Sequence, residues 1–248
     1  MLPRAAELER ACGQLGSIPG FADALKGKDV KVVAEVKRSS PSKGVINREL
    51  DLEKQVAAYE AGGAAAISIL TEPTRFGGSN EDLSRARATV RIPILKKDFH
   101  VETVQILEAR SLGASAALVI ARAVPQSRLQ ELISAGKDVG IEILVEVRDE
   151  AELDLALTLG ARLVGVNNRN LETLEIDPST SLRLLPLIPG DVVAIAESGV
   201  KSAKDVESLA RAGANAVLVG SELSAARDPE AAVRSLTGIT RTPRARES

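Results

Sequence analysis

The sequence predicts an α/β protein of the (β/α)8 TIM-barrel class with a short N-terminal helical extension. Segments with helical periodicity alternate strictly with short apolar segments rich in β-branched residues, which is typical of a parallel sheet with helices outside it. Eight such strand-then-helix units occupy 248 residues, the usual size of a closed barrel. A doubly wound open sheet is the alternative, but the first strand lacks a Gly-x-Gly-x-x-Gly turn.

The first residues are expected to lie outside the barrel. Residues 5–12 have helical spacing, glycines interrupt the pattern between 13 and 20, and 21–25 fit one more helical turn. The predicted organisation is a helical extension and linker over 1–28, a barrel over 29–240 and a basic, flexible tail over 241–248.

The eight units follow in order. Several helical segments end in a glycine beside alanine, as in Leu112-Gly113-Ala114, which suits the left-handed residue that ends a helix before a strand. The predicted strands are 30–37, 65–71, 93–99, 116–121, 142–147, 163–168, 192–198 and 216–220. The predicted helices are 52–61, 81–88, 101–111, 126–138, 149–159, 179–187, 203–212 and 229–236.

Composition excludes several classes of function. With 32 basic and 34 acidic residues and 2% aromatics, the chain has neither the positive field nor the stacking surfaces of a nucleic-acid-binding protein. Cys12 and His100 are the only residues of their types, which excludes an intramolecular disulfide and argues against zinc, haem and Ser-His-Asp sites. No apolar run reaches the roughly 18 residues of a membrane span, and the start is too acidic for a signal peptide. We therefore expect no metal, no nucleic-acid or membrane partner, and a cytoplasmic location.

Polar residues stand at the ends of nearly all predicted strands. Alternation places Glu35 and Lys37 on one face of the first strand. Alone, this pair is equally well explained as a structural ion pair or as part of an edge strand with a solvated face. The other ends carry Ser68, Thr71 and Glu72, then Lys97 and Phe99, Glu146, Asn167, Glu197 with Ser198 and Gly199, and Gly220 with Ser221. Because barrel enzymes place their chemistry at the carboxyl ends of the strands, the whole set predicts an active site.

The last two strand ends predict a phosphate site. Ser198-Gly199 and Gly220-Ser221 follow the seventh and eighth strands, where barrels commonly bind phosphate through backbone N–H groups. Residues 221–226 fit a short helix there. Glycines that only form tight turns are the alternative.

Three conspicuous residues are expected to have ordinary roles. His100 is out of phase with Lys97, which predicts an exposed loop imidazole. Asp98 points away from Lys97 and is expected to brace a neighbouring helix or loop. Cys12 is expected to be a small, at least partly buried thiol.

Six motifs, in order along the chain, resemble one enzyme family. They are Ala34-Glu35-Val36-Lys37-Arg38-Ser39-Ser40-Pro41-Ser42-Lys43-Gly44, Ser68-Ile69-Leu70-Thr71-Glu72 with Phe76-Gly77-Gly78-Ser79, Pro93-Ile94-Leu95-Lys96-Lys97-Asp98-Phe99, Leu144-Val145-Glu146-Val147, Gly165-Val166-Asn167-Asn168-Arg169-Asn170-Leu171 and Ala196-Glu197-Ser198-Gly199. The sequence is similar to indole-3-glycerol phosphate synthases from about residue 32 to 226. The resemblance implies a barrel fold and a step of tryptophan biosynthesis that closes a ring and releases carbon dioxide and water. It implies a small phosphorylated substrate and no cofactor.

The resemblance also implies roles for individual residues. Lys97 is the general acid, Glu146 the base of the dehydration, and Lys37 with Glu35 binds substrate and assists proton transfer; how the two Lys/Glu pairs divide the work stays open. Asn167 holds sugar hydroxyls or the carboxylate, Ser40 and Pro41 hold the anthranilate end, and Phe99 packs on the aromatic ring. Glu197 either orients the lysines or is a structural partner, and Ser198, Gly199, Gly220 and Ser221 hold the phosphate.

Two other functions compete with this interpretation. A phosphoribosylanthranilate isomerase is a barrel of similar size, but it uses a Cys or Asp acid–base pair where this chain has Glu35, Lys37 and Glu146. An inactive barrel that serves as a scaffold would not need charged strand ends. The expected assembly is a monomer or a weak homo-oligomer.

Overall fold

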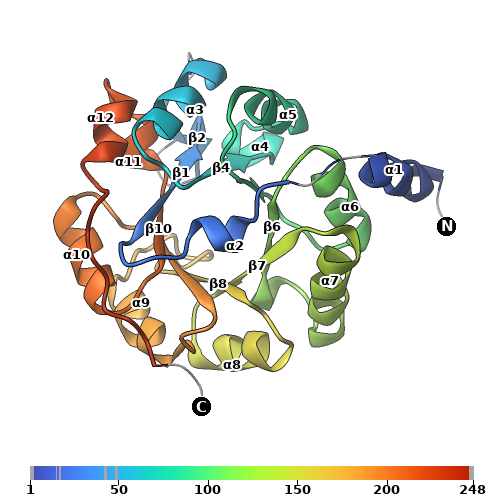
Figure 1. The fold of residues 1–248 in the computed structure, drawn as a ribbon. Helices are drawn as coiled ribbons and strands as arrows, with labels where there is room; N and C mark the ends of the chain where they lie inside the picture. Colours follow the sequence, from blue (N-terminus) through green and yellow to red (C-terminus); the bar gives the residue numbers. More distant parts are fainter. Residues whose placement is uncertain (1–2, 15, 17, 42–43, 48–49, 246–248) are drawn as a thin grey trace.

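The structure is a computed structural model that describes residues 3–14, 16, 18–41, 44–47 and 50–245. Within these residues, eight parallel strands form a closed barrel in the order β1-β10-β9-β8-β7-β6-β5-β4. Helices surround the barrel, as Figure 1 shows in a view along its axis. The predicted (β/α)8 barrel is confirmed.

The strands and helices agree with the predicted alternation. The barrel strands are β1 (Lys31–Val36), β4 (Ala66–Leu70), β5 (Ile94–Lys97), β6 (Ala116–Ile120), β7 (Glu142–Val147), β8 (Leu163–Asn167), β9 (Val193–Glu197) and β10 (Ala216–Val219). The helices are α1 (Pro3–Gln14), α2 (Phe21–Ala24), α3 (Leu52–Ala61), α4 (Pro73–Phe76), α5 (Asn80–Thr89), α6 (Thr103–Ser111), α7 (Gln126–Val139), α8 (Glu150–Thr158), α9 (Ser179–Leu184), α10 (Ala203–Arg211), α11 (Ser221–Ser224) and α12 (Pro229–Arg234). Two 3-10 turns, η1 (Ala121–Ala123) and η2 (Leu185–Leu187), complete the set.

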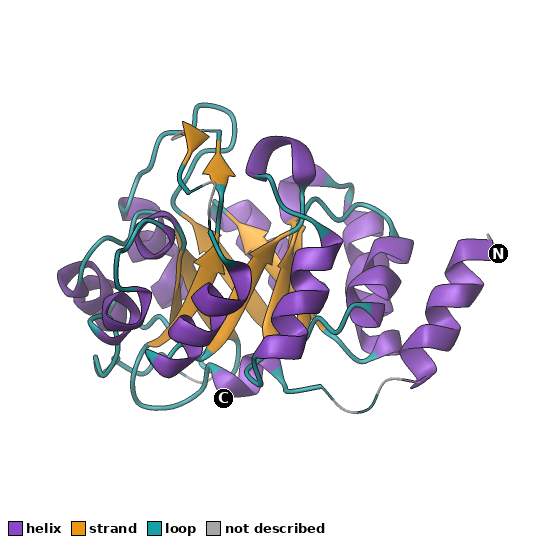
Figure 2. Ribbon diagram, turned by 90° about the horizontal axis from the view of Figure 1, so that it is seen from above, coloured by secondary structure: helices purple, strands orange, loops and turns teal. Residues whose placement is uncertain are grey.

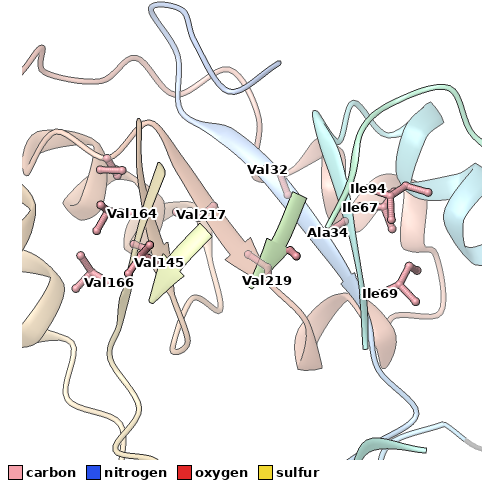
Figure 3. Packing of buried hydrophobic residues seen from close by; sticks show 14 of the residues in the cluster. Val32, Ala34, Ile67, Ile69, Ile94, Val145, Val164, Val166, Val217 and Val219 are labelled. Carbon is pink, nitrogen blue, oxygen red and sulfur yellow. The ribbon is translucent and has the colours of Figure 1, made fainter. Parts of the chain in front are cut away.

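Two hydrophobic layers stabilise the barrel. Alternate residues such as Val32, Ile67 and Val164 face outward and pack beneath the helices, and Figure 3 shows part of this outer layer. The opposite set, which includes Leu95 and Leu144, fills the interior of the barrel. In these regular strands each residue therefore has a fixed side, which decides which polar residues reach the interior.

The amino-terminal end of the barrel is closed by α2. Phe21 and Leu25 are fully buried and belong to the interior layer. Glu142 Oε2, at the start of β7, accepts hydrogen bonds from the N–H groups of Phe21 and Ala22 at 2.5 and 2.9 Å. Figure 1 shows α2 across the barrel axis. The helical turn predicted for 21–25 is thus a plug, and polar strand ends gather at the other end.

A small hairpin stands over that other end. It consists of β2 (Ser39–Ser40) and β3 (Gly44–Val45), in which Ser39 pairs with Val45 and Ser40 with Gly44. Figure 2 shows the hairpin projecting beyond the barrel strands. The sequence predicted a loop over this stretch, and neither the hairpin nor α4 was expected.

Helix α1 lies outside the ring of barrel helices, beside α6 (Figure 1). Cys12 Sγ donates a hydrogen bond to the carbonyl oxygen of Leu107, 3.3 Å away. The thiol is partly buried, as predicted. Among the described residues, no helix has the length and apolar character required to span a membrane.

Residues 241–245, which were predicted to be a flexible tail, form hydrogen bonds to the barrel. Arg244 donates to the carbonyl oxygens of Ile188 (3.0 Å), Val192 (2.5 Å) and Gly213 and to Asn215 Oδ1 (2.8 Å), all near the starts of β9 and β10. The basic composition that suggested a solvated end instead provides a guanidinium with matching acceptors. The last residues of this prediction, 246–248, lie outside the described part.

Replacing Arg244 by alanine should therefore destabilise the barrel floor without affecting the other end. The loss leaves several partly buried carbonyl groups without a donor, so we expect the free energy of unfolding to fall by about 2–4 kcal/mol. Chemical denaturation followed by circular dichroism measures this change. An unchanged unfolding midpoint would show that the tail contacts contribute nothing to stability.

Candidate active site

A pocket of about 540 Å³ opens at the carboxyl ends of the strands. Its polar lining comes from different strands and the loops that follow them: Glu35, Lys37, Glu72, Lys97, Asp98, Glu146, Asn167, Arg169, Ser198, Lys201, Ser221 and Glu222. Its apolar lining includes Leu70, Phe76, Phe99, Leu118, Ile120, Leu171, Ile176 and Leu218. Charged groups beside apolar side chains suit a ligand that has both a charged and an aromatic part.

Lys97 is the centre of the charged group. Its Nζ donates to Glu197 Oε2 and lies 3.9 Å from Glu35 Oε2 and 3.9 Å from Glu146 Oε2. Burial alone would lower the pKa of Lys97, but these three carboxylates outweigh it and hold the pKa above its usual range. The ammonium is therefore protonated at neutral pH and faces the pocket as a proton donor.

Glu35 forms a second ion pair at the end of β1. Its Oε1 lies 2.6 Å from Lys37 Nζ. Burial raises the pKa of Glu35, but Lys37 and Lys97 more than offset this, so the net pKa lies below its usual range. The strand end is held from behind because Ser224 Oγ donates to the Glu35 carbonyl at 3.1 Å and accepts from the Lys37 N–H at 3.1 Å.

Glu146 differs from Glu35 in its protonation. Burial first, and then the charge of Glu197, raise the pKa of Glu146 to about 7, although Lys97 opposes the shift. Its Oε1 accepts a hydrogen bond from Asn167 Nδ2 at 3.0 Å. A carboxyl with this pKa exchanges its proton readily near neutral pH, which is the property of a general base.

Two glycines make room for the carboxylates. A Cβ atom on Gly165 would collide with Glu197 Oε1, and a Cβ on Gly220 would collide with Glu35 Oε1. Gly165 pairs in register with Glu146 on the neighbouring strand. Larger residues at these two positions would force the charged side chains apart.

The loops after β9 and β10 form one side of the pocket. Ser198, Gly199, Gly220 and Ser221 all line it. Ser198 has a left-handed backbone with φ of 67°, and its carbonyl accepts from Asn168 Nδ2 at 2.9 Å. The structure thus brings together the four residues that the sequence predicted for phosphate.

Most predicted site residues line this pocket, and three do not. Glu197 lies against Lys97, behind the lining. Ser40 is buried in the hairpin, and Pro41 is exposed at its turn; neither lines the pocket. The assignment of Ser40 and Pro41 to substrate therefore stays a prediction that needs the hairpin to move inward.

Arg169 lines the pocket and was not singled out from the sequence. Its N–H donates to Asn167 Oδ1 at 2.9 Å, and its guanidinium donates to the Leu174 carbonyl at 2.8 Å. Burial lowers the pKa of Arg169, although the carboxylate of Glu35 opposes this. Its position just after the end of β8, near Asn167, was the available signal, because the loops that follow barrel strands carry site residues.

The prediction for His100 is wrong. Its side chain is only 2% exposed, and Nδ1 lies 2.6 Å from the carbonyl oxygen of Leu118. Burial, and then the charge of Lys96, lower the pKa of His100 to about 4, so the ring is neutral. The alternation argument failed because β5 ends at Lys97 and the chain then turns. Asp98, by contrast, does bond to its surroundings as predicted, through Thr71 and Lys96.

A metal site is not evident in the described part of the chain, since no three His, Cys, Asp or Glu side chains there are grouped as ligands. A barrel with this pocket defines an enzyme whose charged groups suit acid–base chemistry. Its sequence matches a family model described as indole-3-glycerol phosphate synthase over residues 2–236. The chain belongs to the indole-3-glycerol phosphate synthase family.

Individual relatives agree with this assignment. Indole-3-glycerol phosphate synthase 1 of Streptomyces coelicolor is 48% identical over 235 residues, which cover 95% of this chain and 87% of the relative. Indole-3-glycerol phosphate synthase of Kineococcus radiotolerans is 50% identical over 216 residues, covering 87% and 79% of the two chains.

Solved structures with low identity share the fold. The 3-hexulose-6-phosphate synthase of Salmonella typhimurium has a TM-score of 0.67 at 17% identity, over 84% of this chain and 96% of that one. The thiamine phosphate pyrophosphorylase of Pyrococcus furiosus has a TM-score of 0.64 at 14% identity, over 84% and 93%. At these identities the likeness concerns the fold alone.

The raised pKa of Glu146 predicts an effect on stability. Between the ordinary value of 4.5 and about 7, the unfolded chain releases this proton and the folded protein keeps it, so wild-type stability falls as pH rises. Glu146→Gln removes this dependence and retains an acceptor for Asn167. We expect its melting temperature to exceed that of the wild type above pH 7 and to match it below pH 4.5.

Glu35→Gln is the matched control, because the shift of Glu35 has the opposite sign. Its lowered pKa stabilises the folded state above the ordinary value of 4.5, and this stabilisation is lost as pH falls through the folded pKa. Glu35→Gln should therefore melt below the wild type at neutral pH. If both variants shifted in the same direction, the opposite roles of the two carboxyls would be wrong.

Proposed function

We propose that this chain is the carboxy-lyase that converts 1-(2-carboxyphenylamino)-1-deoxyribulose 5-phosphate into indole-3-glycerol phosphate, in tryptophan biosynthesis. The observation that carries the proposal is the position of Lys97 among Glu35, Glu146 and Glu197 at the bottom of the pocket. Family membership and the names of the relatives agree with it.

The charged residues supply the protons for ring closure. As the aromatic carbon attacks the ketone carbon, Lys97 donates a proton to the ketone oxygen, which becomes a hydroxyl. Loss of carbon dioxide then restores the aromatic ring. A carboxylate-held ammonium suits the first step because it is protonated and directed, and its charge stabilises the developing alkoxide.

Dehydration completes the reaction. The hydroxyl leaves as water with a second proton, which Lys37, a further ammonium in the lining, is placed to donate. Glu146, with a pKa of about 7, takes the proton from the neighbouring carbon. Asn167 bonds to Glu146 and lines the pocket, so it orients the base and remains available to the sugar hydroxyls or carboxylate.

The shape of the pocket folds the substrate. Phosphate held by Ser198, Gly199, Gly220 and Ser221, and the aromatic ring against Phe99, bring the two reacting carbons together. Phe99 suits the ring because it is 42% exposed and lines the pocket. Holding reactants in this way can contribute roughly 7–11 kcal/mol in well-oriented systems.

Several finer assignments belong to this proposal. Ser40 and Pro41 would reach the anthranilate end when the β2–β3 hairpin closes over the pocket. The reaction needs one small phosphorylated substrate and no cofactor. We also propose a cytoplasmic location and a monomeric or weakly associating chain.

Lys97→Ala should abolish turnover and leave the barrel folded. Removal of the general acid and its charge is expected to lower kcat by at least about 10³. The fluorescence of the indole product measures turnover, and circular dichroism checks the fold. Near-normal rates in this variant would remove Lys97 as the acid.

Ser221→Asp tests the phosphate position. A carboxylate there would repel the substrate phosphate, so we expect KM to rise by about tenfold or more, which corresponds to about 1.4 kcal/mol. Ser221→Ala should raise KM much less because it introduces no charge. Equal KM values in the two variants would place the phosphate elsewhere.

A further inference from the structure

The residue before Lys97 is a second lysine on the opposite face of β5. Lys96 is 1% exposed, and its Nζ lies 3.2 Å from Asp98 Oδ2 and 3.6 Å from Glu108 Oε2 on α6. A buried ammonium needs such partners, since its desolvation costs several kcal/mol. The neighbouring His100 is neutral and adds no charge.

Asp98 connects this lysine to the ends of two strands. Its Oδ2 also accepts from the Thr71 hydroxyl at 2.5 Å, and its Oδ1 accepts from the Phe99 N–H at 2.8 Å. Thr71 follows β4, and its own N–H donates to the Lys97 carbonyl at 3.1 Å. Both oxygens of Asp98 therefore have donors, which suits a structural link better than a proton acceptor.

These contacts hold the backbone on both sides of Lys97. Lys96, which precedes Lys97, forms an ion pair with Glu108 on α6. Asp98, which follows it, accepts a hydrogen bond from Thr71 at the end of β4. The long side chain of Lys97 is flexible in itself, so the place of its Nζ depends on a fixed Cα and on the carboxylates around it. A displacement of about 1 Å at a catalytic group can lower the rate by about 10².

We propose that Lys96, Asp98 and Glu108 form a positioning cluster that fixes the tip of β5 and thereby aims Lys97 at the reacting ketone. The cluster rests on the proposed function of Lys97 and adds residues that do not themselves transfer protons. The same link holds the backbone of Phe99, on the pocket wall.

Asp98→Asn is the first test. Asparagine keeps the size of the side chain, but in either orientation its N–H2 group takes the place of one acceptor, either the one used by Thr71 and Lys96 or the one used by the Phe99 N–H. We expect kcat to fall by about tenfold to a hundredfold, and KM to change by less than about threefold because the phosphate site is unaffected. Arg244→Ala is the control, since it destabilises the distant floor and should leave kcat per folded molecule unchanged.

Two further variants separate positioning from stability. Thr71→Val removes only the hydroxyl that donates to Asp98. It tests the same link if Asp98→Asn folds poorly, and it should also lower kcat. Lys96→Met should also lower kcat, and the loss in Lys96→Met/Asp98→Asn should be smaller than the product of the single losses. If the loss of kcat in the double variant equals the product of the single losses, the two residues act independently, which contradicts a single cluster.

The outcome that overturns the cluster is a lower melting temperature with wild-type kcat in Asp98→Asn and Thr71→Val. If instead the wild type formed no indole-3-glycerol phosphate, the proposed function would fall. Crystal structures of the wild type and Asp98→Asn would then still decide the positioning role. They support it if Lys97 Nζ moves away from Glu197, and they refute it if Lys97 keeps its place.

Discussion

The site depends on the cost of burying the ammonium of Lys97. At about 4 Å, an effective dielectric constant of about 20 gives roughly 4 kcal/mol of attraction for each opposite charge, so several carboxylates are needed to compensate desolvation. Glu35, Glu146 and Glu197 meet this need from three different strands. With Lys37 included, three carboxylates face two ammonium groups, and the raised pKa of Glu146 absorbs the excess negative charge.

This arrangement constrains residues that carry no charge. Gly165 and Gly220 are small because the carboxylates of Glu197 and Glu35 occupy the space where their Cβ atoms would lie. Behind β1, Tyr59 and Ser224 lie near the Glu35 carbonyl and keep the strand end in place. The apolar residues that line the same pocket add to the burial that shifts the pKa values of Lys97 and Glu146.

Strand periodicity accounts for what the sequence could predict. It placed Glu35 and Lys37 on one face and allowed Glu146 and Asn167 to face inward, because alternation holds wherever a strand is regular. It failed for His100, which lies beyond the end of β5. The basic composition of the tail did not predict the contacts of Arg244, whose acceptors belong to segments far away in the chain. The β2–β3 hairpin and the burial of Ser40 depend on a local fold that no apolar pattern marks. Roles for individual residues came from the family resemblance, because periodicity predicts which face of a strand a residue lies on and not what the residue does in a reaction.

The two ends of the barrel have different roles, and residues 241–245 lie at its amino-terminal end. Arg244 lies near the starts of β9 and β10, a full strand length from the mouth of the pocket. A solid support or a second enzyme attached at Ala245 would therefore lie away from the entrance used by the substrate. Such an attachment leaves the hairpin and the apolar walls open to solvent, so immobilisation through this end preserves access.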